Sequence, residues 1–533
     1  MEGETAAKRR KLEHHRGLSD ADAPGLSSFH MEDLPELFVA KEKKKIEVQR
    51  VTSIICMQTT EYFVITLPGI QPLILSLLSL KEAARTSIVS RKWRMIWTRH
   101  PNLCFDGTKK RPNYEDCVKI ERAKFIETVN SVVQQHSGIG LNKFSIRCSL
   151  PKNSSDHLDM WIRFAAAAKA KIIDINLWSK RYIGGPIKEQ YLFPLENLGA
   201  QDGPFIQALF LTDISIKPHL DMRGFTKLRR LLLDLVHITG DLPGLLSNCC
   251  SLEDLELIAC SGVTDLNIPH RLDKLRHLLI SHMDIQMVDF HVTGLAHFEY
   301  KGGVIPIQLH GCSKLEKATI TFKQDNKTLG HAFTAIPSIS EVKVLNMHAD
   351  MEAYHPVWVS QGHMVTTRPT YMFANLRHLT CEIKIFTRGP NEHSGLLQLA
   401  HYLSFAPQLE TLQLHMLYEI CRFSWEGEAT GEEAASCMRR LDRLKTVYMS
   451  GFRCYRPQVE LLCGILAKSP ALEHVTLQPK VMLACARVLN MCILEYEIWR
   501  WARSASERFG RAITVVRSDG CCREDEQVRP CSV

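Results

Sequence analysis

The chain has 533 residues, of which 45% are hydrophobic and 23% are charged. This is the composition of a folded protein, so it excludes disorder through most of the length, and the length predicts several domains or one long repeat array. The formal net charge is +8, but lysine and arginine are scattered along the chain, which disfavours a nucleic-acid-binding protein.

Residues 1–33 are expected to form a disordered basic tail that includes the run KRRK at Lys8–Lys11. This run is either a nuclear import signal or a solvated charge cluster, so we expect the protein in the nucleus, the cytoplasm or both. The first residues lack an apolar signal core, so the 18 cysteines are expected to be reduced, mostly buried thiols. The stretch VTSIICMQTTEYFVIT is interrupted by Gln58 and Glu61 and is not expected to span a membrane.

Two short helices are predicted within LKEAARTSIVSRKWRMIW. Apolar residues at three- and four-residue steps define one stripe from Leu80 to Ile88 and another from Val89 to Trp97. Ser90 is placed to cap the second helix. Trp93 and Trp97 are either core residues of a helical cap on a repeat array or aromatic anchors for a protein partner.

One short pattern, Leu-x-x-Leu-x-Leu with other apolar residues substituting, recurs over residues 141–480. Successive starts are separated by as few as 20 residues, from Leu275 to Leu295, and by as many as 37, from Ile339 to Leu376. The thirteen starts are Leu141, Ile172, Ile206, Leu228, Leu252, Leu275, Leu295, Leu315, Ile339, Leu376, Leu409, Leu444 and Leu472.

The spacing within this pattern favours strands over helices. On a helix, the third apolar position would lie about 140° from the first, because five residues advance about 500° at 3.6 residues per turn. A short strand over the last three residues instead places the final two apolar side chains on one face. The pattern therefore predicts an α/β leucine-rich-repeat solenoid, with a short helix or turn between strands in stretches such as GDLPGLLSNCCS.

Residues 67–106 resemble the F-box of plant F-box/leucine-rich-repeat proteins, through the pieces ILSLL, LKEAARTS, VSRKWRMIW and PNLCFD. Residues 454–516 resemble the C-terminal FBD segment of that family, through CYRPQVELLCGILAKSPALEHVTLQP. The resemblance implies an N-terminal helical F-box followed by an irregular leucine-rich-repeat solenoid. It also implies a substrate-recognition subunit of an SCF-type ubiquitin ligase, which joins a Skp adaptor, and through it cullin and RING subunits, to a target protein.

The F-box of this family docks on the adaptor, so the resemblance also implies adaptor-facing positions, some of which must be core instead. These positions are Pro68, Ile74, Leu77, Leu78, Leu80, Ala84, Val89, Ser90, Trp93 and Trp97.

The first F-box helix departs from the family pattern, because Pro72 forbids a long regular helix there. Upstream, MEDLPE at residues 31–36 resembles a better start, and excising residues 37–68 would restore the register. Residues 34–66 are therefore interpreted as a split F-box start plus an insertion or a gene-model error.

No nucleotide-binding, metalloprotease or serine-hydrolase motif occurs in the sequence, and the doublets Cys249-Cys250 and Cys521-Cys522 lack a partner pair at metal-ligand spacing. We therefore expect no catalytic residues, metal or cofactor. Two alternatives stay open: a repeat scaffold with a degenerate F-box and no ligase role, and a basic nucleic-acid-associated regulator.

The variable polar positions of the strands either determine target specificity, through acid and base that alternate between neighbouring strands, or only solvate the sheet. These positions are Arg229, Arg230, Glu253, Asp254, Arg276, His277, Arg377, His378, Glu410 and Thr411.

Overall fold

The chain divides into two compact units, residues 1–79 and residues 80–533. Only residues 78 and 79 of the first unit are described, so the fold below is that of the second. The tail expected at 1–33 and the segment 34–66 lie outside the described residues. The computed structural model describes residues 78–86, 97–108, 115–150, 152–178, 190–198, 204–219, 223–268, 272–322, 333, 336–352, 371–386, 394–418, 431–480 and 495–516.

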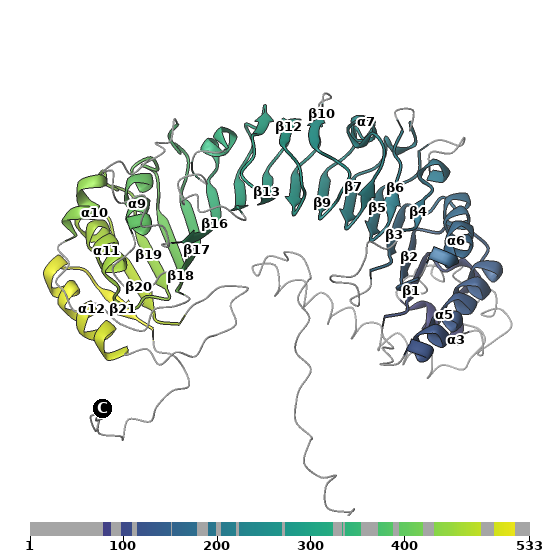
Figure 1. Cartoon of the computed structure of the whole chain (residues 1–533), viewed down its shortest axis with the longest axis horizontal. Coiled ribbons are helices and arrows are strands. Elements are labelled where there is room, and N and C mark those ends of the chain that lie inside the picture. Colours follow the sequence, from purple (N-terminus) through teal and green to yellow (C-terminus); the bar gives the residue numbers. More distant parts are fainter. Residues whose placement is uncertain are drawn as a thin grey trace, which may run out of the picture. The chain divides into compact units, whose positions relative to one another are not determined.

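A parallel sheet of fifteen strands runs through the second unit, and each strand pairs with the strand of the next repeat (Figure 1). Because neighbouring strands are parallel, each connection returns through a second layer of structure. This sheet confirms the expected α/β repeat architecture. Its strands are β1 (Asn102–Asp106), β2 (Lys143–Arg147), β3 (Ile172–Asn176), β5 (Ala208–Thr212), β7 (Arg230–Asp234), β9 (Asp254–Ile258), β11 (His277–Ser281), β13 (His297–Gly302), β15 (Lys317–Phe322), β16 (Val344–Glu352), β17 (His378–Phe386), β18 (Thr411–Tyr418), β19 (Thr446–Ser450), β20 (His474–Gln478) and β21 (Ile513–Val515).

The repeat pattern explains the burial along each strand. In the repeat that begins at Leu228, this residue is buried just before β7, and Leu231 and Leu233 are buried from the strand itself. The residues that alternate with them lie on the opposite side of the sheet, which we name the open face. The strand is five residues long, whereas the motif alone predicted three.

Two of the expected repeat starts are wrong. Strand pairing puts the start of the β3 repeat at Ala170 rather than Ile172. It puts the start of the β16 repeat at Val342 rather than Ile339, which lies in the preceding 3-10 turn. Both stretches contain more apolar residues than the pattern needs, so several registers satisfy it, and pairing with the neighbouring strand selects one.

The sheet extends beyond residues 141–480, where the repeats were expected. Strand β1 pairs with β2, so the last residues of the range expected for the F-box, 67–106, join the repeat sheet. Strand β21 pairs with β20, so the FBD-like range 454–516 also contributes to it. The repeat array and its two flanking segments therefore share one continuous sheet.

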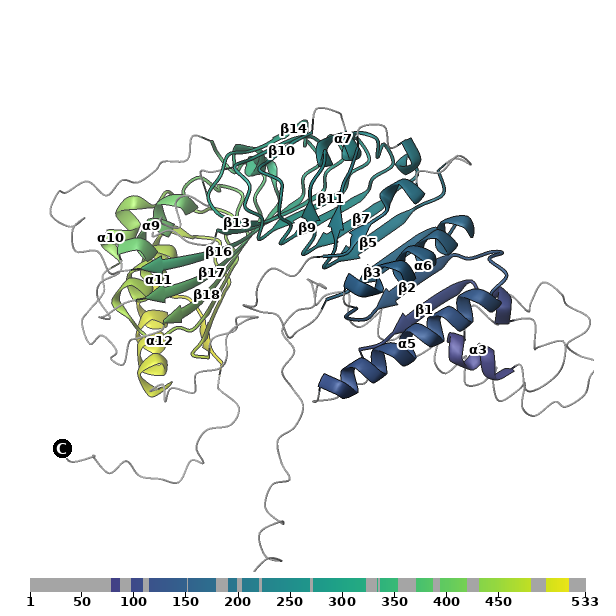
Figure 2. The same ribbon diagram turned by 45° about the vertical axis from the view of Figure 1, so that its right-hand side comes forward.

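Helices and 3-10 turns form much of the second layer, and Figures 1 and 2 show α5 and α6 together on one face of the sheet at β1 to β3. The helix expected in GDLPGLLSNCCS is α7, where the Asp241 side chain accepts a hydrogen bond from Gly244 N at 2.9 Å as an N-cap. No helix in the described ranges is both long and apolar enough to cross a bilayer. The elements are α3 (Leu80–Thr86), α5 (Glu115–Gln135), α6 (Ser155–Ala167), α7 (Leu242–Ser247), α9 (Ser394–Leu403), α10 (Glu432–Cys437), α11 (Arg456–Lys468), α12 (Glu495–Phe509), η1 (Trp97–Arg99), η2 (Lys152–Ser154), η4 (Leu195–Leu198), η5 (Arg223–Phe225) and η6 (Pro337–Glu341).

Two small parallel sheets also belong to the second layer, and the sequence did not predict them. Each has three strands, one from each of three successive repeats. One consists of β4 (Leu192–Phe193), β6 (Ser215–Ile216) and β8 (His237–Ile238), and the other of β10 (Asp265–Ile268), β12 (Met287–His291) and β14 (Ile307–His310).

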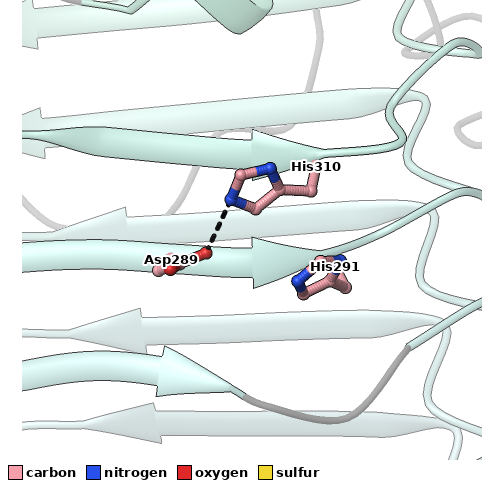
Figure 3. A group of neighbouring side chains, drawn as sticks. All are labelled: Asp289, His291 and His310. Carbon is pink, nitrogen blue, oxygen red and sulfur yellow. Dashed lines mark ion pairs between the residues drawn. The ribbon is translucent and has the colours of Figure 1, made fainter.

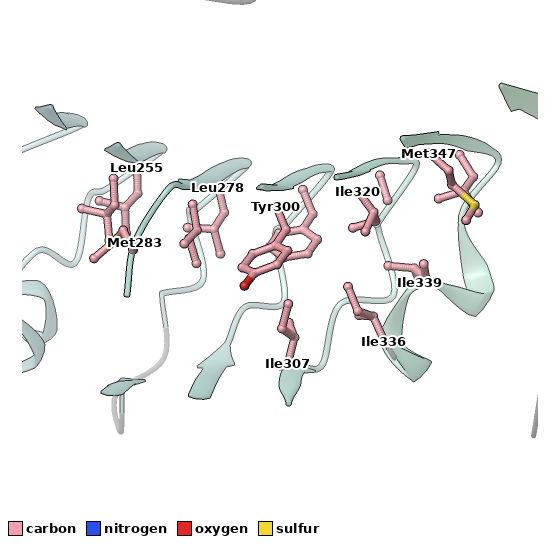
Figure 4. Close-up of a cluster of buried hydrophobic side chains, with 14 of the residues drawn as sticks. Leu255, Leu278, Met283, Tyr300, Ile307, Ile320, Ile336, Ile339 and Met347 are labelled. Atoms are coloured by element: carbon pink, nitrogen blue, oxygen red, sulfur yellow. The ribbon is translucent and has the colours of Figure 1, made fainter. Parts of the chain in front are cut away.

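The hydrophobic core lies between the long sheet and the second layer (Figure 4). Leu255 and Leu278 are register partners on β9 and β11, and each is fully buried. Ile307 of β14 and Ile336, which precedes η6, approach the same core from the second layer. Each buried aliphatic side chain stabilises the fold by about 1.5–3 kcal/mol, so stacking the repeats supplies most of the stability.

Candidate target-binding surface and adaptor-binding segment

The residues immediately before the strands form one continuous line, here named the edge row. Backbone bonds hold it in place: Glu253 N donates to Arg229 O, and Arg276 N donates to Glu253 O, both at 2.8 Å. Neighbouring strands lie about 4.8 Å apart, so the side chains form a ladder at that spacing. From β7 to β20 the row reads Arg229, Glu253, Arg276, Ala296, Glu316, Lys343, Arg377, Glu410, Lys445 and Glu473.

Opposite charges alternate along most of the edge row and form ion pairs between neighbours. Lys343 and Glu316 are both largely exposed, and the hydrogen bond and charge of Lys343 hold the pKa of the Glu316 carboxyl below its usual value. Exposed pairs of this kind contribute little to stability, so their charges remain usable by a partner. The pairs are Arg229–Glu253 at 2.7 Å, Lys343–Glu316 at 3.0 Å and Arg377–Glu410 at 3.7 Å.

A surface groove of about 750 Å³ follows the edge row from the repeat of β9 to that of β17. Glu253, Arg276, Glu316 and Lys343 line it, together with Lys274 from the preceding loop. Arg276 is exposed and forms no ion pair with any described residue. Charged side chains of both signs therefore line the groove and could face an extended segment of a partner.

The ten predicted target-binding residues fall into two groups on this surface. Six lie in the three adjacent repeats of β7, β9 and β11, and four lie in the repeats of β17 and β18. The repeats of β13, β15 and β16 separate the two groups, and sequence reasoning missed their edge residues Glu316 and Lys343. Glu316 and Lys343 occupy the same position in their repeats as Arg229 and Glu253 do in theirs, and this shared position could have identified them.

Five of the ten predicted residues occupy the first position of a strand rather than the edge row. Arg230, Asp254 and His277 are register partners on the open face, and the Arg230 guanidinium lies 5.3 Å from the centre of the Phe210 ring. His378 and Thr411 pair in the same way on β17 and β18. The first strand positions thus form a second row of polar side chains beside the edge row.

His277 occupies an acidic part of the open face. Its Nε2 lies 3.9 Å from Glu299 Oε1, and Glu256 lies on β9, on the other side of strand β11 from Glu299. Burial lowers the pKa of His277, but the hydrogen bond and charge of Glu299, together with the charges of Glu256 and Asp254, raise it overall. Burial also raises the pKa of the Glu256 carboxyl. As the pH falls, the His277 ring therefore becomes protonated at a higher pH than a free imidazole does.

A polar cluster farther along the open face was missed by sequence reasoning. His348, Glu382, His415 and Ser450 are successive register partners on β16 to β19. His348 Nδ1 lies 2.9 Å from Glu382 Oε2, and His415 Nδ1 lies 2.8 Å from Ser450 Oγ. Burial lowers the pKa of His415. We count this cluster as part of the candidate target-binding surface.

The helical part of the F-box segment is described at α3 and η1 only. Helix α3 packs against η1 and β1, with Ala83 fully buried and Leu80 partly buried against the core. Ala84 and Trp97 are half-buried, and Leu78 is half-buried in the first unit. The other six proposed adaptor positions lie outside the described residues: Pro68, Ile74, Leu77, Val89, Ser90 and Trp93.

Backbone and side-chain bonds tie the end of this segment to the first repeat. Ser137 N donates to Thr98 O at 2.8 Å, and Asn142 N donates to Pro101 O at 2.7 Å. The buried His136 ring places Nε2 3.0 Å from His100 O. The segment that precedes β1 is therefore held by the loop between α5 and β2.

The FBD-like segment, residues 454–516, contains α11, β20, α12 and β21. Gln458, the third residue of α11, is fully buried and fastens the loop before this helix. Its Oε1 accepts a hydrogen bond from Arg453 N at 2.8 Å, and its Nε2 donates to Gly451 O at 3.0 Å. Oε1 also accepts a hydrogen bond from Tyr455 N at 3.4 Å, so the buried side chain satisfies three backbone groups.

Two family models match the chain. The model of the At1g61320/AtMIF1 LRR domain matches residues 132–509, and the F-box domain model matches residues 68–105. The first spans more than half of the chain, so the protein belongs to this F-box/leucine-rich-repeat family.

Most of the chain is similar to plant proteins whose names combine an F-box with leucine-rich repeats or with an FBD segment. The putative F-box/LRR-repeat protein At4g00320 of Arabidopsis thaliana is 25% identical over 400 residues, which cover 70% of this chain and 75% of the relative. The putative FBD-associated F-box protein At1g61330 of Arabidopsis thaliana is 22% identical over 423 residues, which cover 76% of this chain and 88% of the relative. The Leptospira interrogans LRR protein LIC12759 aligns with 75% of this chain and 93% of its own, at 13% identity and a TM-score of 0.27. The expected resemblance to plant F-box, leucine-rich-repeat and FBD proteins is confirmed.

Proposed function

We propose that the protein is the substrate-recognition subunit of an SCF-type cullin-RING ubiquitin ligase. The F-box segment would bind a Skp-type adaptor, and through it the cullin and RING subunits, while the repeats hold a target protein. The observation that carries this proposal is the F-box match at residues 68–105 in the same chain as the repeat match at residues 132–509. The proposed location in the nucleus, the cytoplasm or both rests on the Lys8–Lys11 run alone.

The connection between the two segments supports a positioning role. Strand β1 belongs both to the F-box match and to the repeat sheet, and Thr98 and Pro101 are bonded to the loop before β2. An adaptor bound to this segment would hold a target on the repeats at a restricted distance from the ubiquitin-charged enzyme. Catalysis would come from proximity, so the chain needs no catalytic group of its own.

The edge row and the groove beside it are the proposed target-binding surface. Their alternating charges favour a partner that presents complementary charges about 4.8 Å apart, as an extended segment or a neighbouring strand does. Among the edge-row residues, we expect replacement of Arg276 to weaken target binding most, because Arg276 lines the groove and has no ion-pair partner among the described residues.

The first test is adaptor binding by the purified full chain, measured by surface plasmon resonance. Trp93→Ala with Trp97→Ala should weaken binding at least about tenfold, since buried aromatic anchors dominate such interfaces. Tyr496→Ala with Trp499→Ala is the matched control, because it removes two exposed aromatics from α12. Equal urea midpoints of the variants would show that folding is intact.

No binding by the full chain would contradict the ligase role and favour a repeat scaffold. Repeating the measurement without residues 37–68 would then show whether that segment blocks the adaptor. Equal loss of binding in the α12 control would assign the contact to a different part of the chain.

A further inference from the structure

Three metal-binding side chains converge on the second layer of the solenoid (Figure 3). Asp289 and His291 are two residues apart on β12, so both point to the same side of the strand. Val288, before Asp289, and Phe290, between the two, are fully buried, so Asp289 and His291 point away from the core. His310 is the register partner of His291 on the neighbouring strand β14. The parallel pairing therefore gathers two imidazoles and one carboxylate at one place.

The distances suit a small cation. One ligand atom from each side chain lies within 4.8 Å of the other two, and His310 Nε2 lies 3.1 Å from Asp289 Oδ1. A tetrahedral ion with bonds of about 2.0–2.2 Å needs ligand atoms about 3.3–3.5 Å apart. At 3.1 Å, the Asp289–His310 pair is slightly closer than this and needs to open by about 0.2–0.4 Å. The exposed His291 needs to move its ligand atom by at most about 1.5 Å, as a turn of its ring allows.

The present partners leave the carboxylate incompletely satisfied. Asp289 Oδ1 is shielded from solvent and accepts no hydrogen bond of good geometry from any described residue, although His310 lies at ion-pair distance. The rings of His291 and His310 stack with their centres 4.7 Å apart and their planes inclined by 23°. A bound cation would satisfy the carboxylate and draw both rings toward one point.

We propose that Asp289, His291 and His310 form a binding site for Zn²⁺, with water as the fourth ligand. Imidazole and carboxylate together suit zinc and similar divalent transition ions, whereas Ca²⁺ and Mg²⁺ prefer oxygen ligands alone. The sequence predicted no metal, because the two cysteine doublets lack a partner pair at metal-ligand spacing. The ion would join β12 to β14 and so link two successive repeats. The site is independent of the proposed ligase role.

The experiment measures zinc binding by the full chain after chelator treatment, using equilibrium dialysis and metal analysis. The 23 histidines and 18 cysteines provide a background, so the informative quantity is the difference between chains. Chains with Asp289→Asn, His291→Asn or His310→Gln should each bind one Zn²⁺ fewer than the wild type, or should bind this ion at least about tenfold more weakly. Loading with Co²⁺ should give a tetrahedral visible spectrum that the same variants lose.

His348→Gln is the matched control, because His348 forms a similar ion pair with Glu382 at 2.9 Å outside this cluster. We expect it to retain the full zinc content. Equal zinc content in the wild type and in the triple variant of Asp289, His291 and His310 would overturn the proposal. Displacement of the bound ion by Mg²⁺ at the same concentration as Zn²⁺ would also overturn it. A loss of zinc in the His348 control as large as in the site variants would also overturn it. Equal urea midpoints of the zinc-free chains would exclude misfolding as the cause of a loss.

Discussion

A series of glycine substitutions tests how closely the repeats approach one another. Gly262 lies just after β9 with φ of +85°, and a Cβ added there would stand 2.1 Å from Ile238 O of the preceding repeat. A Cβ added at Gly294 would stand 2.3 Å from Asp273 O, but the backbone of Gly294 is not left-handed. Gly140 has φ of +72° with nothing within 4 Å of an added Cβ. The three positions therefore separate backbone strain from steric contact.

The magnitudes follow from these two effects. Gly140→Ala should cost about 1 kcal/mol, because left-handed strain of about 1–2 kcal/mol is partly offset by about 0.4–1 kcal/mol of lower entropy in the unfolded chain. Gly294→Ala should cost about 1–3 kcal/mol, the usual range for overpacking. Gly262→Ala combines both effects and should cost about 2–4 kcal/mol.

Relief of the contact at Gly262 would also disturb specific hydrogen bonds. Ser261 N donates to Val236 O at 3.0 Å, and Ile238 N donates to Ser261 O at 2.9 Å. Each such bond contributes about 0.5–1.5 kcal/mol, so their weakening belongs to the expected cost. In Gly262→Ala, hydrogen exchange should become faster at the Ser261 and Ile238 amides.

Urea unfolding followed by circular dichroism would measure the three free energies. The expected order of cost is Gly262→Ala, then Gly294→Ala, then Gly140→Ala. If Gly262→Ala cost no more than Gly140→Ala, the close approach of neighbouring repeats would be refuted. Unchanged exchange at the two amides would lead to the same conclusion.

Three further predictions concern single side chains. Gln458→Ala should lower the free energy of unfolding by about 2–4 kcal/mol, because it removes the hydrogen bonds of this side chain to three backbone groups of the loop. Urea unfolding would check this, and a cost below about 0.5 kcal/mol would contradict it. The charged form of His277 is favoured in the fold, so its stabilisation is fully present below the usual imidazole pKa of about 6.5 and is lost as the pH rises through its raised folded pKa. The charged form of His415 is disfavoured, so its penalty grows as the pH falls through about 6.5 toward its lowered folded pKa, and the cost of replacing it by Gln should fall on acidification while that of His277→Gln rises. Urea midpoints at pH 5.5 and 8 would show these opposite slopes, and parallel slopes would contradict the prediction. Iodoacetamide should modify the exposed Cys250 in the native protein but leave Cys249, which is buried with a thiol pKa raised to about 12, unmodified until unfolding, as peptide mapping would show.

The sequence specified the strands where its apolar residues allowed one register only. Leu228, Leu231 and Leu233 satisfy the repeat pattern in a single way, so their burial could be predicted. The β3 and β16 repeats could not be placed, because extra apolar residues around Ile172 and Ile339 offered alternatives that strand pairing decides. The small second-layer sheets could not be predicted, since strands of two to five residues depend on stacking between repeats.

The same distinction applies to the candidate site. The edge row could be predicted at positions such as Arg229 and Glu253, because it directly follows the first apolar residue of each motif. The cluster around His348 and Glu382 could not, because β16 and β17 are nine residues long and run past the end of the motif. The Asp289, His291 and His310 group unites two repeats in three dimensions, which no local spacing reveals.

The one-per-repeat arrangement of the edge row affects how this surface can change during evolution. Each repeat contributes one side chain to the edge row, and the core residues of that repeat point to the other side of the sheet. A point mutation in the row therefore changes one side chain outside the core while leaving the packing intact. Duplication or loss of a repeat would shift all later contacts by about 4.8 Å at once. Under the proposed target-binding role, new targets would be acquired gradually by substitution or abruptly by a change in repeat number.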